Sequence, residues 1–243
     1  MALTIQLVGD VHEEIEVYKR WWGEHRVDGV LMVDPRIDDP RIGELDRLGL
    51  PAVVIGGPLE NSSLPAVWHD EASVVTEAVQ YLGALGHERI AQVAGVSDFV
   101  HTRQRTTAFR LAAEELGLEW QIVETDYSAE NGARVTRKLL SSPNAPTAIV
   151  FDSDLLAVTG LGVAQQMGFA IPDELSIIGW DDSLISQVVH PPLTAITRDI
   201  EAYGIAAARR LLAAIEGESD EHLETMRGEL TPRASTGRPV NNR

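Results

Sequence analysis

Short apolar runs alternate with longer amphipathic stretches along the whole chain, and this alternation constrains the fold more than any other feature. Six runs read as strands because they are rich in β-branched residues and bounded by Gly, Pro or Asp. They cover residues 28–34, 51–57, 89–95, 147–153, 175–181 and 193–199. Most are continuously apolar, which is typical of a parallel sheet covered by helices on both faces. The sequence therefore predicts a doubly wound α/β fold with ligands at the carboxyl ends of the strands.

The stretches between these runs carry signals for helix ends. Asp70, Ser128 and Ser153 each precede a stretch of helical period, and their side chains can accept a hydrogen bond from the first turn. Gly86 and Gly168 follow two of these stretches, where a left-handed residue commonly ends a helix. We therefore expect three capped helices at these positions.

The last long helix, 200–217, has an apolar side and a basic side. Its expected apolar side consists of Ile205, Ala208, Leu212 and Ile215. Arg209 and Arg210 lie on the opposite side at helical spacing. The pattern predicts that the apolar side packs into the core, and a dimer face around Tyr203 and Ile205 is the alternative.

Composition excludes several functions for these residues. The formal net charge is −17, which repels phosphate backbones and anionic membranes, so the polypeptide by itself is not expected to hold nucleic acid or a membrane. Cys is absent, and the start "MALTIQLVGD" lacks a basic n-region and cleavage site. No apolar run approaches the roughly 20 residues of a spanning helix. These features predict a cytoplasmic location.

Enzyme signatures are missing from the sequence. It has no G-x-x-x-x-G-K-[ST] phosphate loop, no G-x-S-x-G elbow and no H-E-x-x-H motif. The segment 12–14 (His-Glu-Glu) and the pair His69–Asp70 each offer a few metal ligands without the wider cluster that a site needs. We therefore expect no catalysis, no metal and no cofactor.

Four motifs together resemble the effector-binding core of LacI-type transcription repressors, which is similar in fold to periplasmic sugar-binding proteins. They are "LGALGHERIAQVAG" (82–95), "RQRTTAFR" (103–110), "SIIGWDD" (176–182) and "PPLTAI" (191–196). They occur in the family's order, and the resemblance runs from about residue 28 to residue 236. The G-H-x-x-I and P-x-D-x-S segments favour the repressor branch over the periplasmic one.

The resemblance implies two doubly wound lobes of periplasmic-binding-protein type, joined by three crossovers, with the ligand in the cleft between them. The N-terminal lobe is expected over 1–67 plus 199–227, and the C-terminal lobe over 69–198 plus 228–243. The opening "ALTIQLVGD" resembles the family's second strand, so the first strand–helix unit is expected to be missing and the first lobe incomplete. The implied partners are a second copy of the chain and operator DNA, the latter only through a helix-turn-helix headpiece not in this chain.

The resemblance also places six effector-binding residues. They are Arg103, Asp181, Tyr127, Ser153, Trp68 and Arg198. An ionised carboxylate at Asp181 can accept hydrogen bonds from neighbouring hydroxyls, and a guanidinium fork can donate to two oxygens. Core packing competes with the ligand role for Trp68, and capping competes with it for Ser153. Arg105 and Asp182 are expected to have structural roles.

Several ligands and functions stay open at this point. The implied effector is a sugar, a sugar phosphate or a nucleoside. Two arginines in one cleft (Arg103 and Arg198) would favour an acidic ligand, whereas Asp152 close by would offset one of the two charges. The expected function is that of a ligand-responsive transcription regulator. The alternatives are a solute-binding protein of a sugar transporter and a doubly wound enzyme acting on a sugar phosphate, and no nucleophile or base emerges to support the enzyme.

Overall fold

The computed structural model describes residues 2–57, 59, 62–218 and 224–240. The chain forms two compact units, the first made of Met1–Trp68 and Ile200–Met226 and the second of His69–Asp199 and Arg227–Arg243. The backbone therefore passes from one unit to the other three times. None of the described helices combines the length and the apolar character needed to cross a lipid bilayer.

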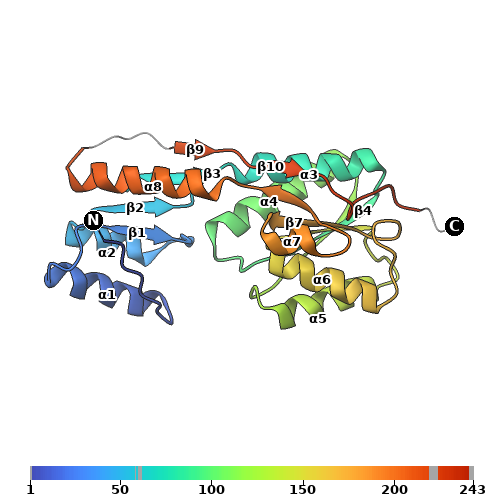
Figure 1. Ribbon diagram of the computed structural model, residues 1–243, viewed down its shortest axis with the longest axis horizontal. Helices are drawn as coiled ribbons and strands as arrows, with labels where there is room; N and C mark the ends of the chain where they lie inside the picture. The colour runs from blue at the N-terminus through green and yellow to red at the C-terminus, as the bar shows by residue number, and fades with distance from the viewer. Residues whose placement is uncertain (1, 58, 60–61, 219–223, 241–243) are drawn as a thin grey trace. The chain divides into compact units, whose positions relative to one another are not determined.

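The first unit contains a four-stranded sheet in the order β1-β2-β3-β9 (Figure 1). Its strands are β1 (Val30–Val33), β2 (Ala52–Ile55), β3 (Ala66–His69) and β9 (Glu224–Met226). Its helices are α1 (Val11–Gly23), α2 (Pro40–Leu48) and α8 (Ile200–Ile215). The pairs β1–β2 and β2–β3 are parallel, as the continuously apolar runs predict.

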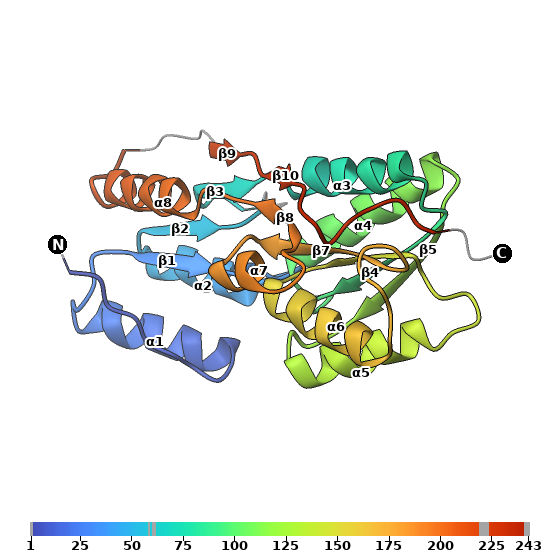
Figure 2. The same cartoon turned by 45° about the vertical axis from the view of Figure 1, so that its right-hand side comes forward.

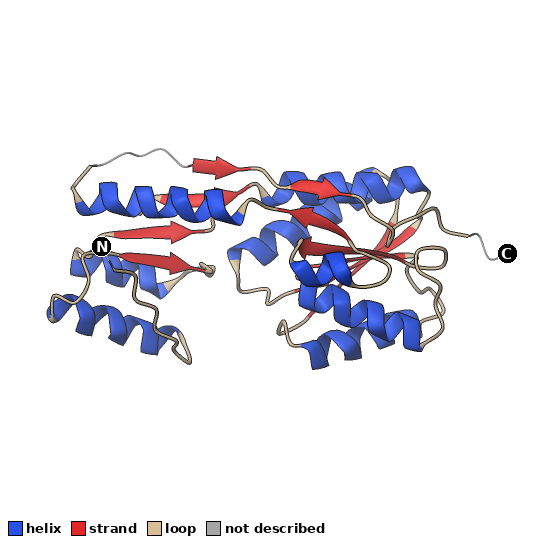
Figure 3. Ribbon diagram, in the orientation of Figure 1, coloured by secondary structure: helices blue, strands red, loops and turns tan. Residues whose placement is uncertain are grey.

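Helices cover both faces of this sheet because successive strand residues point to opposite sides. Val54 of β2 packs in a cluster with Tyr18 of α1 and Leu45 of α2. Its neighbour Val53 packs on the opposite face with Ala206 of α8. The two helical layers are visible in Figure 3. A fully apolar strand is therefore needed here, since neither face meets water.

Two expectations for the first unit are wrong. Residues 2–8 form no strand, and Leu3, Ile5 and Leu7 are largely exposed. The segment is strand-like in sequence, but β1 pairs only with β2 among the described strands, so nothing lies beside residues 2–8 to complete a ladder. On α8, Ile205 and Leu212 are also exposed. The helix instead buries the small side chains Ala206 and Ala207, which allow its backbone to approach the sheet.

The second unit contains a six-stranded sheet in the order β10-β8-β7-β6-β4-β5. All neighbouring pairs are parallel except β10–β8. The strands are β4 (Arg89–Ala94), β5 (Glu119–Glu124), β6 (Ala148–Phe151), β7 (Ser176–Asp181), β8 (Thr194–Thr197) and β10 (Glu229–Thr231). The helices are α3 (Glu71–Leu85), α4 (Val100–Glu115), α5 (Ala129–Leu140), α6 (Asp154–Gln166) and α7 (Leu184–Val188). All six strand runs expected from the sequence are present in the two sheets.

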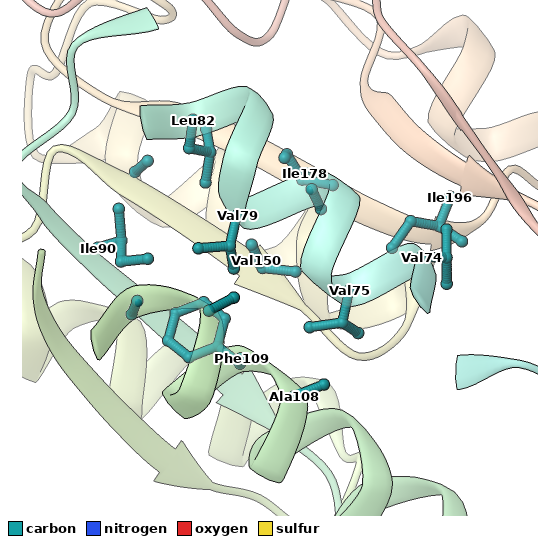
Figure 4. Close-up of a cluster of buried hydrophobic side chains, with 14 of the residues drawn as sticks. Val74, Val75, Val79, Leu82, Ile90, Ala108, Phe109, Val150, Ile178 and Ile196 are labelled. Atoms are coloured by element: carbon teal, nitrogen blue, oxygen red, sulfur yellow. The ribbon is translucent and has the colours of Figure 1, made fainter. Parts of the chain in front are cut away.

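Two hydrophobic layers hold this sheet. One joins α3 and α4 to the strands around Phe109, Ile178 and Val150 (Figure 4). The other joins α5 and α6 to the opposite face around Phe151 and Leu161. Figure 2 shows these helix pairs on the two sides of the sheet. The strands β4, β6, β7 and β8 are almost entirely buried, which fixes the positions of the residues at their ends.

The expected helix caps are confirmed. The side chains of Asp70, Ser128 and Ser153 accept hydrogen bonds from backbone N–H groups in the first turns of α3, α5 and α6. Gly86 follows α3 with φ +95° and Gly168 follows α6 with φ +88°, both in the left-handed region that glycine adopts without strain. The caps set where each helix starts after the preceding strand, and the glycines set where α3 and α6 end.

Candidate functional site

Charged side chains gather at the carboxyl edge of the second unit's sheet. β4, β6, β7 and β8 run parallel, so the residues at their carboxyl ends meet at one edge. Four charged residues there belong to strand ends or helix starts, and a fifth comes from α4. We call this set the carboxyl-edge array: Glu71, Arg105, Asp152, Asp181 and Arg198.

Glu71 joins the two arginines of the array. Its Oε2 accepts from Arg105 Nε at 2.8 Å, and its Oε1 lies 3.5 Å from Arg198 Nη1. Arg198 Nη2 in turn donates to Asp181 Oδ1. The result is a continuous chain of ion pairs from α4 through α3 to the ends of β8 and β7. Exposure rises along it, because the Glu71 side chain is 8% exposed and that of Asp181 is 39% exposed.

Arg105 is the buried anchor of the array. Its Nη1 donates to the backbone carbonyl of Asp152 at 3.1 Å, and its guanidinium lies 3.6 Å from the ring centroid of Trp180. Burial opposes its charge, but the Glu71 carboxylate raises the pKa of Arg105 above its ordinary value. Burial likewise disfavours the Glu71 anion, yet Arg105 holds the pKa of Glu71 below its usual range. Both groups are therefore charged at neutral pH.

Asp152 follows β6 and ties it to β4. Its Oδ1 accepts from Gln92 Nε2 at 2.8 Å, and its Oδ2 accepts from Gly95 N at 3.1 Å. Burial raises the pKa of Asp152, an effect that Arg105 partly offsets. Because both oxygens are engaged within the protein, Asp152 organises the edge and leaves the exposed groups to meet a ligand.

An aromatic group closes the β4–β5 side of the edge. The Tyr127 hydroxyl lies 3.0 Å from His101 Nε2 and 3.3 Å from Thr102 Oγ1. A Cβ on Gly95 would come within 1.9 Å of the Tyr127 ring, so the ring position requires glycine there. Burial and the nearby Arg105 lower the pKa of His101 to about 4. His101 is therefore neutral at physiological pH.

The two adjacent carboxylates after β7 have separate partners. Asp181 and Asp182 both have positive φ, +85° and +54°, so the strand ends abruptly and the side chains diverge. Asp182 forms two hydrogen bonds of 2.7 Å with the guanidinium of Arg233 and accepts another from Thr197. Asp182 is thus a structural residue, whereas Asp181 is the outermost member of the array.

The structure brings some of the predicted site residues together. Asp181 and Arg198 are in direct contact, and Tyr127 lies on the same edge beside Gly95. Ser153 follows Asp152, and its Oγ caps α6 by accepting from Leu156 N at 3.2 Å.

Four of the six predicted site residues are not members of the array. Tyr127 and Ser153 lie at the same edge of the sheet. Arg103 is exposed on α4, and Trp68 belongs to β3 of the first unit. The effector-binding role of all six predicted residues stays a prediction.

Sequence reasoning missed Glu71 and His101. It expected a structural role for Arg105, and the contacts of Arg105 with the Glu71 carboxylate and the Asp152 carbonyl agree with that expectation. Helical period was the available signal for Arg105. It lies three, four and seven residues before Ala108, Phe109 and Ala112, all of which are buried, and so shares their side of α4. Arg103 does not lie on that buried side of α4. Glu71 gave no comparable signal, because an acid in the first turn is ordinary at a helix N-terminus.

The chain is similar to known transcription regulators. It matches the model of the periplasmic binding protein-like domain over residues 79–236. It is 32% identical over 218 residues to the HTH-type transcriptional regulator CelR of Thermobifida fusca, covering 88% of this chain and 63% of that protein. It is 32% identical over 214 residues to the HTH-type transcriptional regulator MalR of Streptomyces coelicolor, covering 85% and 62%. The chain thus spans less than two thirds of the length of these relatives.

Solved structures agree with these matches. The crystal structure of a LacI family transcriptional regulator from Bifidobacterium animalis subsp. lactis is 35% identical with a TM-score of 0.90, over 96% of this chain and 86% of that chain. A structure of the transcriptional regulator CelR–cellobiose complex is 30% identical with a TM-score of 0.84, over 92% and 70%. These similarities extend over most of the chain.

Proposed function

Because the chain belongs to the LacI family of transcriptional regulators, we propose that it is the effector-binding core of a ligand-responsive transcription regulator. The effector is a sugar or a related small polar metabolite. It binds at the carboxyl edge of the second unit's sheet, where Asp181 and Arg198 are the most accessible members of the array.

The carboxyl-edge array is the single observation that carries this proposal. The inner members of the array, Glu71, Arg105 and Asp152, are buried and paired with one another or with the backbone. They hold the two outer charged side chains, those of Asp181 and Arg198, in fixed positions. Vicinal hydroxyls suit such a pair, since a hydroxyl can donate to the carboxylate of Asp181 and accept from the guanidinium of Arg198. Charge assistance makes these hydrogen bonds stronger than neutral ones.

The relatives support a regulatory role over that of a transporter's solute-binding protein or of an enzyme. Those named above are transcription regulators, and one is described in complex with cellobiose, a neutral disaccharide. Operator DNA is the proposed second partner, held by a helix-turn-helix segment of the type that the relatives' names specify. The chain's net charge of −17 opposes direct contact with DNA by these residues. The same proposal places the protein in the cytoplasm.

A thermal-shift screen tests the ligand part of the proposal. The panel contains glucose, cellobiose, maltose, a nucleoside and glucose 6-phosphate. A ligand present at 100 times its dissociation constant adds about 2.7 kcal/mol of stability, which raises the melting temperature by several degrees.

Two variants near the opposite ends of β7 make the screen specific for the site. Asp181→Asn should lose most of the ligand-induced shift, whereas Asp173→Asn should keep it, because exposed Asp173 precedes the other end of β7. An equal response of both variants would place the ligand elsewhere.

We also propose that the chain forms a homodimer through an apolar patch on the second unit. The patch consists of Leu155 on α6 with Leu184, Ile185 and Val188 on α7, which are between 47% and 75% exposed. Asp154 accepts from Ser183 N and Ser186 Oγ, so α7 is fixed against the start of α6 and the patch is preorganised. A regulator that reads two half-sites needs two copies of the reader, which makes a second copy of this chain the natural occupant.

Sedimentation at micromolar concentration tests the dimer. The combined change Leu184→Glu and Val188→Glu should give monomer, because two carboxylates would be buried without partners. Leu116→Glu changes an exposed leucine just after α4 and should stay dimeric. A wild-type monomer, or a dimer that persists in the double variant, would contradict this interface.

A further inference from the structure

We propose that Glu71 is a specificity-determining residue that restricts this site to uncharged polyhydroxyl ligands. The inference rests on the proposed function and specifies its ligand class. Its basis is that a single buried carboxylate engages both arginines of the carboxyl-edge array, so that neither is left with free positive charge.

The position of Glu71 is fixed from three directions. It is the first residue of α3, directly after the cap Asp70, so the helix backbone holds its Cα. Each carboxylate oxygen is paired with a different arginine: Oε2 with Arg105 of α4, and Oε1 with Arg198, which follows β8. The side chain is 8% exposed. A ligand cannot displace so enclosed a group without leaving a buried charge unpaired.

The charges at this edge balance. Arg105 and Arg198 are matched by Glu71 and Asp181, and Asp152 adds no positive charge in either protonation state. The neighbouring histidines are neutral as well. Burial and, to a smaller extent, the charge of Arg198 lower the pKa of His69. Burial and the charge of Arg105 lower the pKa of His101 to about 4. A phosphate or carboxylate ligand would therefore meet no net positive potential and would be repelled by Asp181.

An uncharged ligand meets a different environment. Arg198 Nε is buried and has no hydrogen-bond partner among the described residues. A hydroxyl oxygen can accept from it without disturbing the ion pairs. Asp181 remains open to accept from a second hydroxyl, since its side chain is 39% exposed. Thus the array discriminates by charge and still offers hydrogen bonds to a polyol. The expectation of an acidic ligand rested on Arg103 and Arg198, and the array does not contain Arg103.

The test is the isosteric change Glu71→Gln, measured by titration calorimetry with inorganic phosphate, glucose 6-phosphate and glucose. Gln keeps the size and can still accept from Arg105, but it removes the charge that offsets Arg198. Wild-type protein should show no measurable binding of phosphate or glucose 6-phosphate. The variant should bind both with an affinity at least tenfold above the weakest that the titration can detect. The matched control is Glu77→Gln, which removes an exposed carboxylate of the same helix that is also paired with an arginine, Arg227; it should behave as wild type.

The outcomes separate this inference from the proposed function. If wild type binds a neutral carbohydrate but the variant gains no anion binding, the role of Glu71 is refuted and the proposed function stands. If no carbohydrate binds wild type but the variant gains phosphate binding, the charge role stands and the proposed function is refuted. Binding of glucose 6-phosphate by wild type would overturn the inference directly.

A second variant guards against misfolding. Asp181→Asn lies at the exposed end of the array and frees the same arginine, Arg198, without creating a buried defect. It should also gain phosphate binding, by a smaller factor than Glu71→Gln. Circular dichroism establishes whether Glu71→Gln folds. If it does not, an unchanged phosphate affinity in Asp181→Asn refutes the inference.

Discussion

Replacing Arg105 with Met is expected to destabilise the second unit strongly. Met keeps the aliphatic part of the side chain and removes the guanidinium. Glu71 Oε2 then loses its partner at 2.8 Å, the carbonyl of Asp152 loses a donor, and the face of Trp180 loses the cation 3.6 Å from its centroid. Breaking a buried ion pair from one side costs about 3–5 kcal/mol, because the remaining charge stays buried. The cation–π contact alone contributes about 2 kcal/mol when desolvated.

Guanidinium chloride unfolding followed by circular dichroism measures the loss. The free energy of unfolding should fall by about 3–5 kcal/mol, and the melting temperature by roughly 10 °C, at about 2–4 °C per kcal/mol for a unit of this size. Arg110→Met is the control on the same helix. Arg110 pairs with Glu114 at 3.0 Å while 40% exposed, so its loss should change stability by less than about 1 kcal/mol.

The double variant Arg105→Met/Glu71→Gln isolates the cause. If the cost comes from an unpaired buried carboxylate, removing that charge as well should restore part of the stability. A loss below about 1 kcal/mol in Arg105→Met would refute the anchoring role. A double variant no more stable than Arg105→Met would show that the unpaired charge is not the source of the loss.

Two further predictions concern stability. Gly95→Ala should lower the free energy of unfolding by about 1–3 kcal/mol, because its Cβ would overlap the Tyr127 ring. Gly162→Ala is the control: nothing lies within 4 Å of its Cβ, so this change should raise the free energy of unfolding by about 0.5–1 kcal/mol. Thermal unfolding measures both, and equal effects would contradict the packing of the ring. His101 has a folded pKa of about 4 against an ordinary 6.5, so between these values the unfolded chain takes up the proton and stability falls with falling pH, by up to about 3 kcal/mol. His101→Gln should lose less stability than wild type over that interval, and identical pH profiles would exclude this histidine as a cause.

The strands and helix ends were predictable because their causes are local. Buried strands must be apolar on both faces, and caps need a particular side chain at one position, so the six strand runs and the caps Asp70, Ser128 and Ser153 could be recognised from the chain alone. The strand expected over residues 2–10 failed for the opposite reason. A strand exists only with a neighbour, and its own residues do not reveal whether one is present.

The candidate site was only partly predictable, and charge pairing shows why. The sequence by itself determined that strand ends carry Asp152, Asp181 and Arg198 and that an arginine pair opens the helix after β4. Only the tertiary structure decided which arginine lies in the array and that Glu71, over a hundred residues from Arg198 along the chain, neutralises it. Composition and periodicity are properties of one segment, whereas an electrostatic pair depends on the distance between side chains that three separate elements bring together.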